Sequence, residues 1–147
     1  MIRCITVKSY YGKVKLAISY EKDINIKREM NKDNCLGIDI GVDNIVAISA
    51  SNQAKSWIVK GGYIKSINQF YNKKLAELKS QLETVNRTKT SKRIQRLGMK
   101  RMHKLDYEFH CLSKMIIDLC LENDVGKIVI GHNRGWKQDS NLGKKIN

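Results

Sequence analysis

The chain of 147 residues contains no proline and no Cys-x-x-Cys pair. The spacing of its four cysteines therefore predicts no zinc site, and we expect four reduced, mostly buried thiols. These thiols belong to Cys4, Cys35, Cys111 and Cys120. The lack of proline is unusual for a complete enzyme with several loops, and residues 143–147 complete no helix or strand. Both observations are consistent with a fragment of a longer protein.

Long apolar runs and acidic residues are also scarce. No segment approaches the roughly 20 apolar residues that a membrane-spanning helix needs, and no apolar block resembles a signal peptide. We therefore expect a cytoplasmic protein with no membrane partner. The chain has 28 Lys and Arg against 14 Asp and Glu, for a formal net charge of +14. Such an excess favours a polyanionic partner, most commonly the phosphates of a nucleic acid.

The first 34 residues predict a β-hairpin followed by a linker. Apolar and polar residues alternate through residues 1–20, which indicates two half-buried strands that turn at Gly12. Residues 21–34 are polar and charged and carry no such pattern, so we interpret them as a linker.

Residues 35–60 predict three further strands, at 35–41, 44–50 and 56–60. The turns between them are rich in the Gly, Asn, Asp and Ser residues that favour tight turns. The first of these strands is apolar on both faces except at Asp39, which is typical of a central strand that is covered on both sides.

Two long helices and a final strand complete the pattern. Apolar residues recur at helical spacing over 64–85 and over 92–123, which predicts an antiparallel helical hairpin, with Thr90 or Ser91 as the cap of the second helix. Residues 127–130 predict a last strand. A strand that follows a helical crossover usually lies parallel to its neighbour. The predicted fold is an α/β, RNase H-like mixed sheet with the fourth strand beside the first.

The helical hairpin holds most of the excess positive charge. Twelve basic residues and only two acidic ones lie between Lys65 and Lys104. A solvated helical surface needs fewer charges, so we predict contact with phosphates. Trp136 and Lys137 follow the last strand, where the indole could stack on a base or pack against the end of the sheet. The predicted nucleic-acid-binding residues are Lys73, Lys74, Lys89, Lys92, Arg93, Arg96, Lys100, Arg101, Trp136 and Lys137.

Asp39 is the candidate metal ligand. A charge inside an apolar strand is costly unless a partner compensates it, and at the end of the first strand this carboxylate would face the open edge of the sheet. Two-metal nucleases need several carboxylates at such a place, and oxygen ligands favour Mg²⁺ or Mn²⁺. The alternative is a hydrogen-bonded turn aspartate, which is the role that we favour for Asp43.

Three separated blocks together resemble one protein family. They are residues 37–44 (GIDIGVDN), 91–97 (SKRIQRL) and 128–138 (IVIGHNRGWKQ). The chain is similar here to the TnpB (OrfB) proteins of bacterial insertion sequences, which are transposases or transposase accessory proteins and act as RNA-guided DNA nucleases.

The resemblance implies an incomplete RuvC-type nuclease domain of RNase H-like fold over residues 35–147, with a basic helical hairpin inserted before the fourth strand. Residues 1–20 would end a preceding β-rich nucleic-acid-binding domain. The implied partners are DNA and a guide RNA, and the implied cofactor is Mg²⁺ or Mn²⁺. Asp39 matches the first catalytic aspartate of the family.

The chain departs from the family pattern after its last strand. A second catalytic glutamate commonly follows that strand, whereas residues 131–133 (GHN) carry no acid. The third aspartate and the zinc ribbon would lie past Asn147. The resemblance thus implies a truncated endonuclease fragment that binds nucleic acid and is not active alone. One alternative is a nuclease-dead RNA- or DNA-binding protein. Another is a sugar-kinase or actin-like ATPase fragment, which Val42 disfavours because such phosphate loops place Thr or Ser there.

Overall fold

The computed structural model describes residues 1–23, 28–52, 55–85 and 90–131. The chain divides into two compact units, which are described separately. One comprises Met1–Lys27 with Phe70–Lys104, and the other comprises Arg28–Gln69 with Leu105–Asn147. No described helix is long and apolar enough to cross a membrane.

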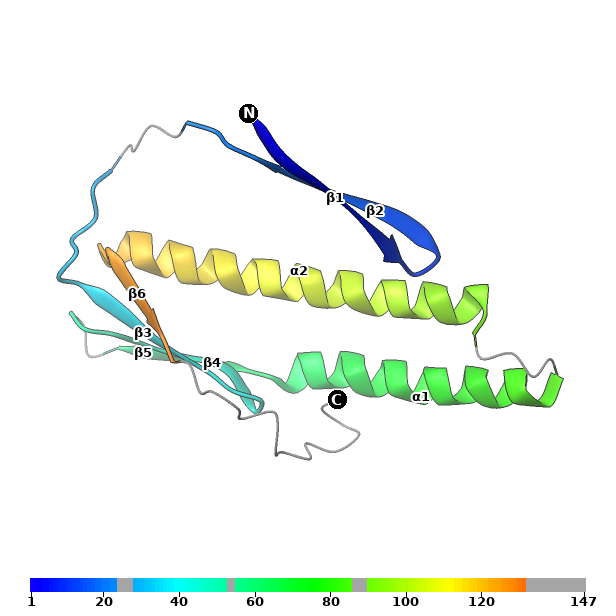
Figure 1. Ribbon diagram of the computed structural model, residues 1–147. Coiled ribbons are helices and arrows are strands. Elements are labelled where there is room, and N and C mark those ends of the chain that lie inside the picture. Colours follow the sequence, from blue (N-terminus) through cyan, green and yellow to red (C-terminus); the bar gives the residue numbers. More distant parts are fainter. Residues whose placement is uncertain (24–27, 53–54, 86–89, 132–147) are drawn as a thin grey trace. The chain divides into compact units, whose positions relative to one another are not determined.

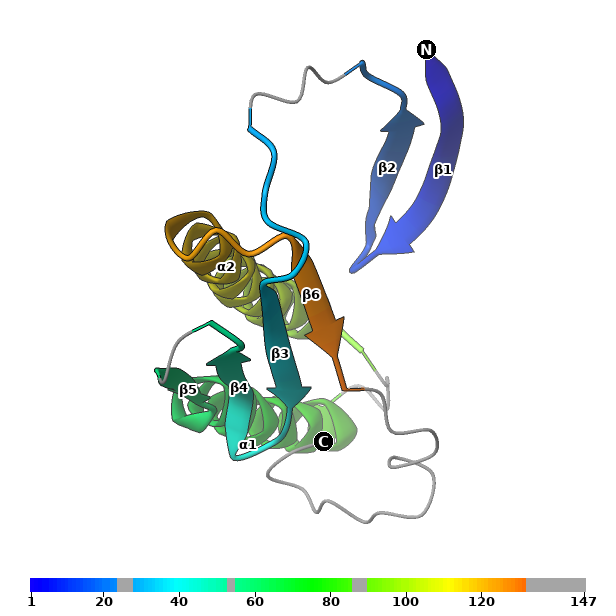
Figure 2. The ribbon, with the colours of Figure 1, turned by 90° about the vertical axis from the view of Figure 1, so that its left-hand side faces the viewer.

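A four-stranded mixed sheet forms the centre of the second unit. Its strands are β3 (Cys35–Ile40), β4 (Asn44–Ala50), β5 (Ser56–Lys60) and β6 (Lys127–Ile130). Figure 2 shows their order, which is β5-β4-β3-β6, with β6 parallel to β3 and the other pairs antiparallel. The predicted position of the fourth strand beside the first is confirmed.

One face of this sheet packs against the C-terminal half of α2 (Lys92–Glu122). Pairing sets Ile38 opposite Ile48 and Leu36 opposite Ala50, so alternate side chains of β3 and β4 lie on the same face. Leu36 and Ile48 are fully buried. Each such side chain contributes about 1.5–3 kcal/mol relative to an exposed one. The apolar face of α2 supplies the other half of this core, at Leu112, Met115, Ile116, Leu119 and Cys120.

The opposite face of β3 is open, and the prediction of a strand covered on both sides is wrong. Gly37 and Asp39 are exposed there, and so is Ser49 on β4. The apolar run in the sequence is misleading because the residues that point to this face are small or polar, and they offer little surface for a second layer to bury.

The first unit contains a two-stranded hairpin of β1 (Ile2–Tyr10) and β2 (Lys13–Tyr20), together with parts of α2 and of α1 (Gly62–Val85), all labelled in Figure 1. Tyr11 and Gly12 both have positive φ angles, 49° and 75°, as a two-residue hairpin turn of type I′ requires. The predicted hairpin and its turn are therefore confirmed.

The prediction that the hairpin strands are half-buried is wrong. Pairing places Ile5 opposite Ile18 and Val7 opposite Leu16 on one face of the ribbon, and all four side chains are more than half exposed. The alternation in the sequence does produce an apolar face, but among the described residues no element covers it.

The tip of the hairpin contacts α2 within the first unit. The ring of Tyr11 lies against Gly98, where a side chain would collide with it, and the Gln95 side chain reaches Gly12. Tyr10 stacks on His103 with 6.2 Å between ring centroids. The helix begins as predicted, because the Ile94 amide donates a hydrogen bond to Ser91 Oγ at 3.3 Å.

The prediction that the four thiols are mostly buried is wrong. Cys120 is buried in the core and Cys35 is half-buried, but Cys4 and Cys111 are exposed, so the thiols are not mostly buried. Burial raises the pKa of the Cys120 thiol.

Candidate metal and nucleic-acid sites

Asp39 lies near the end of β3 on the open face of the sheet. It pairs with Ala47 of β4, and its side chain borders an open hollow of about 480 Å³ that strands β3 to β6 line. No hydrogen bond or ion pair joins its carboxylate to another described residue. The sheet thus presents one exposed carboxylate near the end of β3, with neither oxygen engaged by a described residue.

Gly131 occupies the neighbouring position on this face. Its amide donates a hydrogen bond to the Ile38 carbonyl at 2.8 Å, which continues the parallel ladder by one residue. Within the described part of the chain, no three His, Cys, Asp or Glu side chains cluster closely enough to hold a metal ion. These donors do not fit a complete two-metal centre, and no cleavage step follows from them.

Asp43 has the turn role that its position predicts. It follows β3 in the turn before β4, and its carboxylate forms an ion pair with Lys65 at the start of α1. Its backbone carbonyl also accepts a hydrogen bond from Gly61 at 2.7 Å. Asp43 therefore joins the turn to the first helix, and its carboxylate is already engaged by Lys65.

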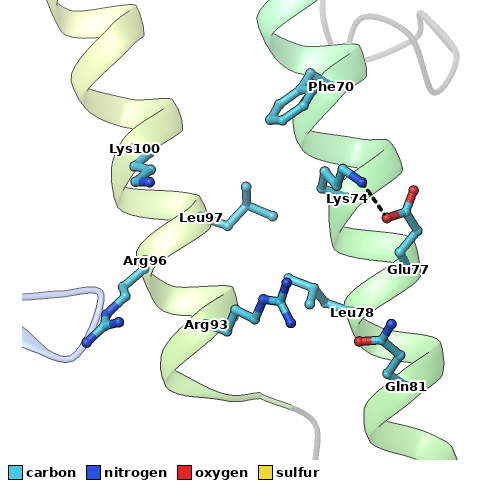
Figure 3. A pocket seen from close by; sticks show the side chains of 9 residues that line it. All are labelled: Phe70, Lys74, Glu77, Leu78, Gln81, Arg93, Arg96, Leu97 and Lys100. Carbon is cyan, nitrogen blue, oxygen red and sulfur yellow. Dashed lines mark hydrogen bonds and ion pairs between the residues drawn. The ribbon is translucent and has the colours of Figure 1, made fainter.

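Two helix segments in the first unit enclose a second hollow, here called the interhelical hollow. It measures about 370 Å³ and is lined by five side chains of α1 and four of α2, all shown in Figure 3. Four of these side chains belong to predicted nucleic-acid-binding residues, namely Lys74, Arg93, Arg96 and Lys100. The structure thus brings together cations that lie on two different helices.

Two of the charged side chains that line the interhelical hollow form an ion pair with each other. Lys74 Nζ lies 2.8 Å from Glu77 Oε2, and this hydrogen bond holds the pKa of the Glu77 carboxyl below its usual value. Figure 3 shows Arg93 extending from α2 toward α1, whereas Arg96 extends away from α1. The positive charge that remains beyond the Lys74–Glu77 pair therefore lies on α2.

The other predicted nucleic-acid-binding residues are dispersed. Lys73 and Lys92 are exposed on their helices but do not line the interhelical hollow. The Arg101 guanidinium lies over the Tyr71 ring, 5.0 Å from its centroid. Lys89, Trp136 and Lys137 lie outside the described residues, as does the choice between stacking and packing for Trp136.

Sequence reasoning missed the apolar part of the interhelical hollow. Phe70 is one of the apolar residues that recur at helical spacing over 64–85, yet it is 58% exposed and lines the hollow with Leu78 and Leu97. The available signal was spacing, since Phe70, Lys74 and Leu78 recur every four residues on one helical face. That pattern mixes apolar and charged residues, so neither a hydrophobic stripe nor a basic stripe identifies it.

The order of the strands and the helical crossover before β6 define an RNase H-like fold of the RuvC type. Residues 16–137 match the family model OrfB_IS605, described as a probable transposase, and the chain belongs to this family. The resemblance inferred from the three sequence blocks is thereby confirmed. None of the curated proteins compared with the chain matches it.

A solved structure supports the same fold. It is a chain from the structure titled "Cryo-EM structure of the Cas12f1-sgRNA-target DNA complex", with a TM-score of 0.63 and 17% sequence identity. The match covers 86% of the present chain but only 26% of that chain. The present chain thus spans about a quarter of that relative's length.

Proposed function

We propose that this chain is a nucleic-acid-binding part of a TnpB-like, RNA-guided DNA endonuclease, with DNA and a guide RNA as its partners. The observation that carries the proposal is that four cationic side chains from two helices, Lys74, Arg93, Arg96 and Lys100, line one hollow in a member of a probable transposase family. Only Glu77 opposes this charge within the lining. Lysines and arginines gathered in this way neutralise phosphates.

Asp39 is proposed as a catalytic residue that ligates Mg²⁺ or Mn²⁺. Its carboxylate is exposed at the end of a strand and engaged by no described partner, and hard divalent cations prefer such oxygen donors. A single carboxylate cannot fix two ions. The proposal therefore includes no cleavage by this chain alone, and further ligands would have to come from other residues.

The proposed domain organisation assigns residues 1–20 to the end of a preceding β-rich domain that binds nucleic acid, 21–34 to a linker, and 35–147 to the nuclease domain. The exposed apolar face of the β1–β2 ribbon supports the first part, because a face of this kind is normally covered in a complete domain.

A nuclease-dead binding protein is the second candidate function. The observation that favours it is the glycine beside Asp39, since Gly131 occupies a place from which a second carboxylate could reach the same ion. Cleavage of DNA by the purified chain with Mg²⁺, abolished by Asp39→Asn, would contradict this candidate. It would equally contradict the proposal that the chain alone does not cleave DNA.

Nucleic-acid binding is tested by titrating labelled DNA and RNA with the 147-residue protein over a series of salt concentrations. We expect log K to fall with log[salt] with a slope of about −2 or steeper, because at least three cations should contact phosphates. Replacing Arg93, Arg96 and Lys100 by Gln should make that slope shallower by about two. The matched control replaces Lys55, Lys60 and Lys127 by Gln, which removes equal charge outside the hollow. Absence of binding at low salt would overturn the proposal.

A further inference from the structure

The interhelical hollow has both a cationic and an apolar surface. Binding of a phosphate alone requires only the cationic one. Arg93 and Lys100 lie on one side, while Phe70, Leu78 and Leu97 supply apolar surface between the helices. A phenylalanine that is 58% exposed contributes less to helix packing than a buried one. Its ring is available to a ligand that has both a flat apolar part and negative charge.

A nucleotide whose base is unstacked has this combination of properties. The bases of a duplex stack on one another, so their faces cannot reach a side chain, and a duplex offers the hollow only phosphates and sugars. In a single strand the base faces are free, and aromatic side chains bind them with little regard to sequence. A volume of about 370 Å³ lies at the small end of ligand pockets, which suits one nucleotide better than a larger element.

We propose that the interhelical hollow binds one unstacked nucleotide of a single strand, an inference that rests on the nucleic-acid-binding function proposed above. The base stacks on the Phe70 ring and contacts Leu78 and Leu97. The adjoining phosphate lies toward α2, between Arg93 and Lys100, because Glu77 on α1 repels it and Lys74 is already paired with Glu77. The hollow thereby distinguishes single strands from duplex.

The test compares three labelled probes of equal length with the 147-residue protein: an oligothymidylate of about twelve nucleotides, a strand with the same phosphates but abasic sites, and a duplex. Phe70→Ala should weaken binding of oligothymidylate by about ten-fold, because stacking on an aromatic ring is lost. Binding of the abasic strand and of the duplex should stay within about two-fold. Arg93→Gln should weaken binding of all three probes and reduce the salt slope by about one.

Three further variants distinguish loss of the Phe70 ring from misfolding of the protein. Phe70→Leu keeps an apolar side chain and helix propensity but removes the ring face, so it should weaken binding of oligothymidylate alone. Phe70→Trp keeps an aromatic ring, so it should retain or strengthen that binding. Phe109→Ala is the matched control, because Phe109 is 48% exposed on α2 and lies outside the hollow. It should leave binding of all three probes unchanged.

The outcomes separate the two proposals. If the wild-type protein binds the probes but the Phe70 variants weaken all three equally, or none, the nucleotide pocket is overturned while nucleic-acid binding stands. Tighter binding of an acidic peptide than of oligothymidylate would also overturn it. If the wild-type protein binds no probe at low salt, both proposals fail.

Discussion

A Cβ atom placed on Gly131 would lie 3.6 Å from Oδ1 of Asp39, which is ordinary contact distance across the edge of the sheet. A carboxylate introduced here therefore needs no rearrangement of the backbone and would lie beside a second carboxylate.

Gly131→Asp should lower the stability of the metal-free protein at neutral pH by roughly 1 kcal/mol, because two like charges then lie about 4 Å apart. Mg²⁺ should recover that loss, since two carboxylates bind the ion better than one. Thermal melting with and without Mg²⁺ measures both effects. Gly131→Asn has the same size without the charge and should show neither effect. A Mg²⁺-independent melting temperature in Gly131→Asp would contradict the proposed geometry.

The two isoleucines at 48 and 18 provide a matched test of burial. Ile48 is 2% exposed within the core and Ile18 is 54% exposed on the hairpin ribbon. Ile48→Ala should cost about 2–5 kcal/mol, whereas Ile18→Ala should cost under about 1 kcal/mol, because only the first leaves a cavity. Urea unfolding followed by circular dichroism gives both values. Equal losses would show that the apolar face of the ribbon is covered in solution.

A substitution at Gly98 tests the contact between the hairpin tip and α2. A Cβ there would lie 2.9 Å from Cδ1 of Tyr11, closer than real contacts allow. Glycine to alanine inside a helix usually stabilises by about 1 kcal/mol. Here Gly98→Ala should instead release the hairpin tip, which faster amide exchange in residues 8–15 would report. Adding Tyr11→Ala should remove the collision and restore the gain in helix stability. Unchanged exchange in Gly98→Ala would contradict the contact.

The burial of Cys120 predicts that the protein loses stability at alkaline pH. Burial raises the pKa of its thiol, so the folded protein holds this proton more tightly than the unfolded chain does. That stabilisation is fully present below the pKa of the unfolded thiol and is lost as pH rises through the higher folded pKa. We expect urea midpoints to fall above about pH 8.5, and to fall less steeply in Cys120→Ala.

The exposed cysteines give the control for that experiment. Cys4→Ala removes an exposed thiol and should leave the alkaline slope unchanged. In the native protein at neutral pH, Cys4 and Cys111 should react with a disulfide reagent faster than Cys120, which is protected by burial. Equal reaction rates would show that the core around Cys120 opens readily.

The fold was largely predictable because its elements carry strong local patterns. The strand at 127–130 was predicted with its observed bounds and its position beside β3, since few topologies bring a strand back parallel after a helical crossover. The prediction failed where burial depends on what lies opposite. The apolar run of β3 and the alternation of β2 specify which residues share a face, but not whether another layer covers that face.

The candidate sites were predictable to different degrees. Asp39 was identifiable as a lone charge in an apolar strand, whereas the proximity of Gly131 depends on strand register. Likewise, the cations of both helices were evident from composition. Their convergence with Phe70, Leu78 and Leu97 depends on how two helix segments face each other, which spacing within either helix alone does not specify.

The pairing of Ile38 with Ile130 has a consequence for how the protein is made. Strands β3, β4 and β5 can form their meander as soon as they leave the ribosome, since only short turns separate them. The edge of β3 that pairs with β6 then stays unpaired until both long helices have been synthesised and β6 has left the ribosome. Closing so long a loop is entropically costly and slow. During that interval the nascent chain presents an unpaired strand edge, the feature through which polypeptides associate with one another and which chaperones have reason to shield.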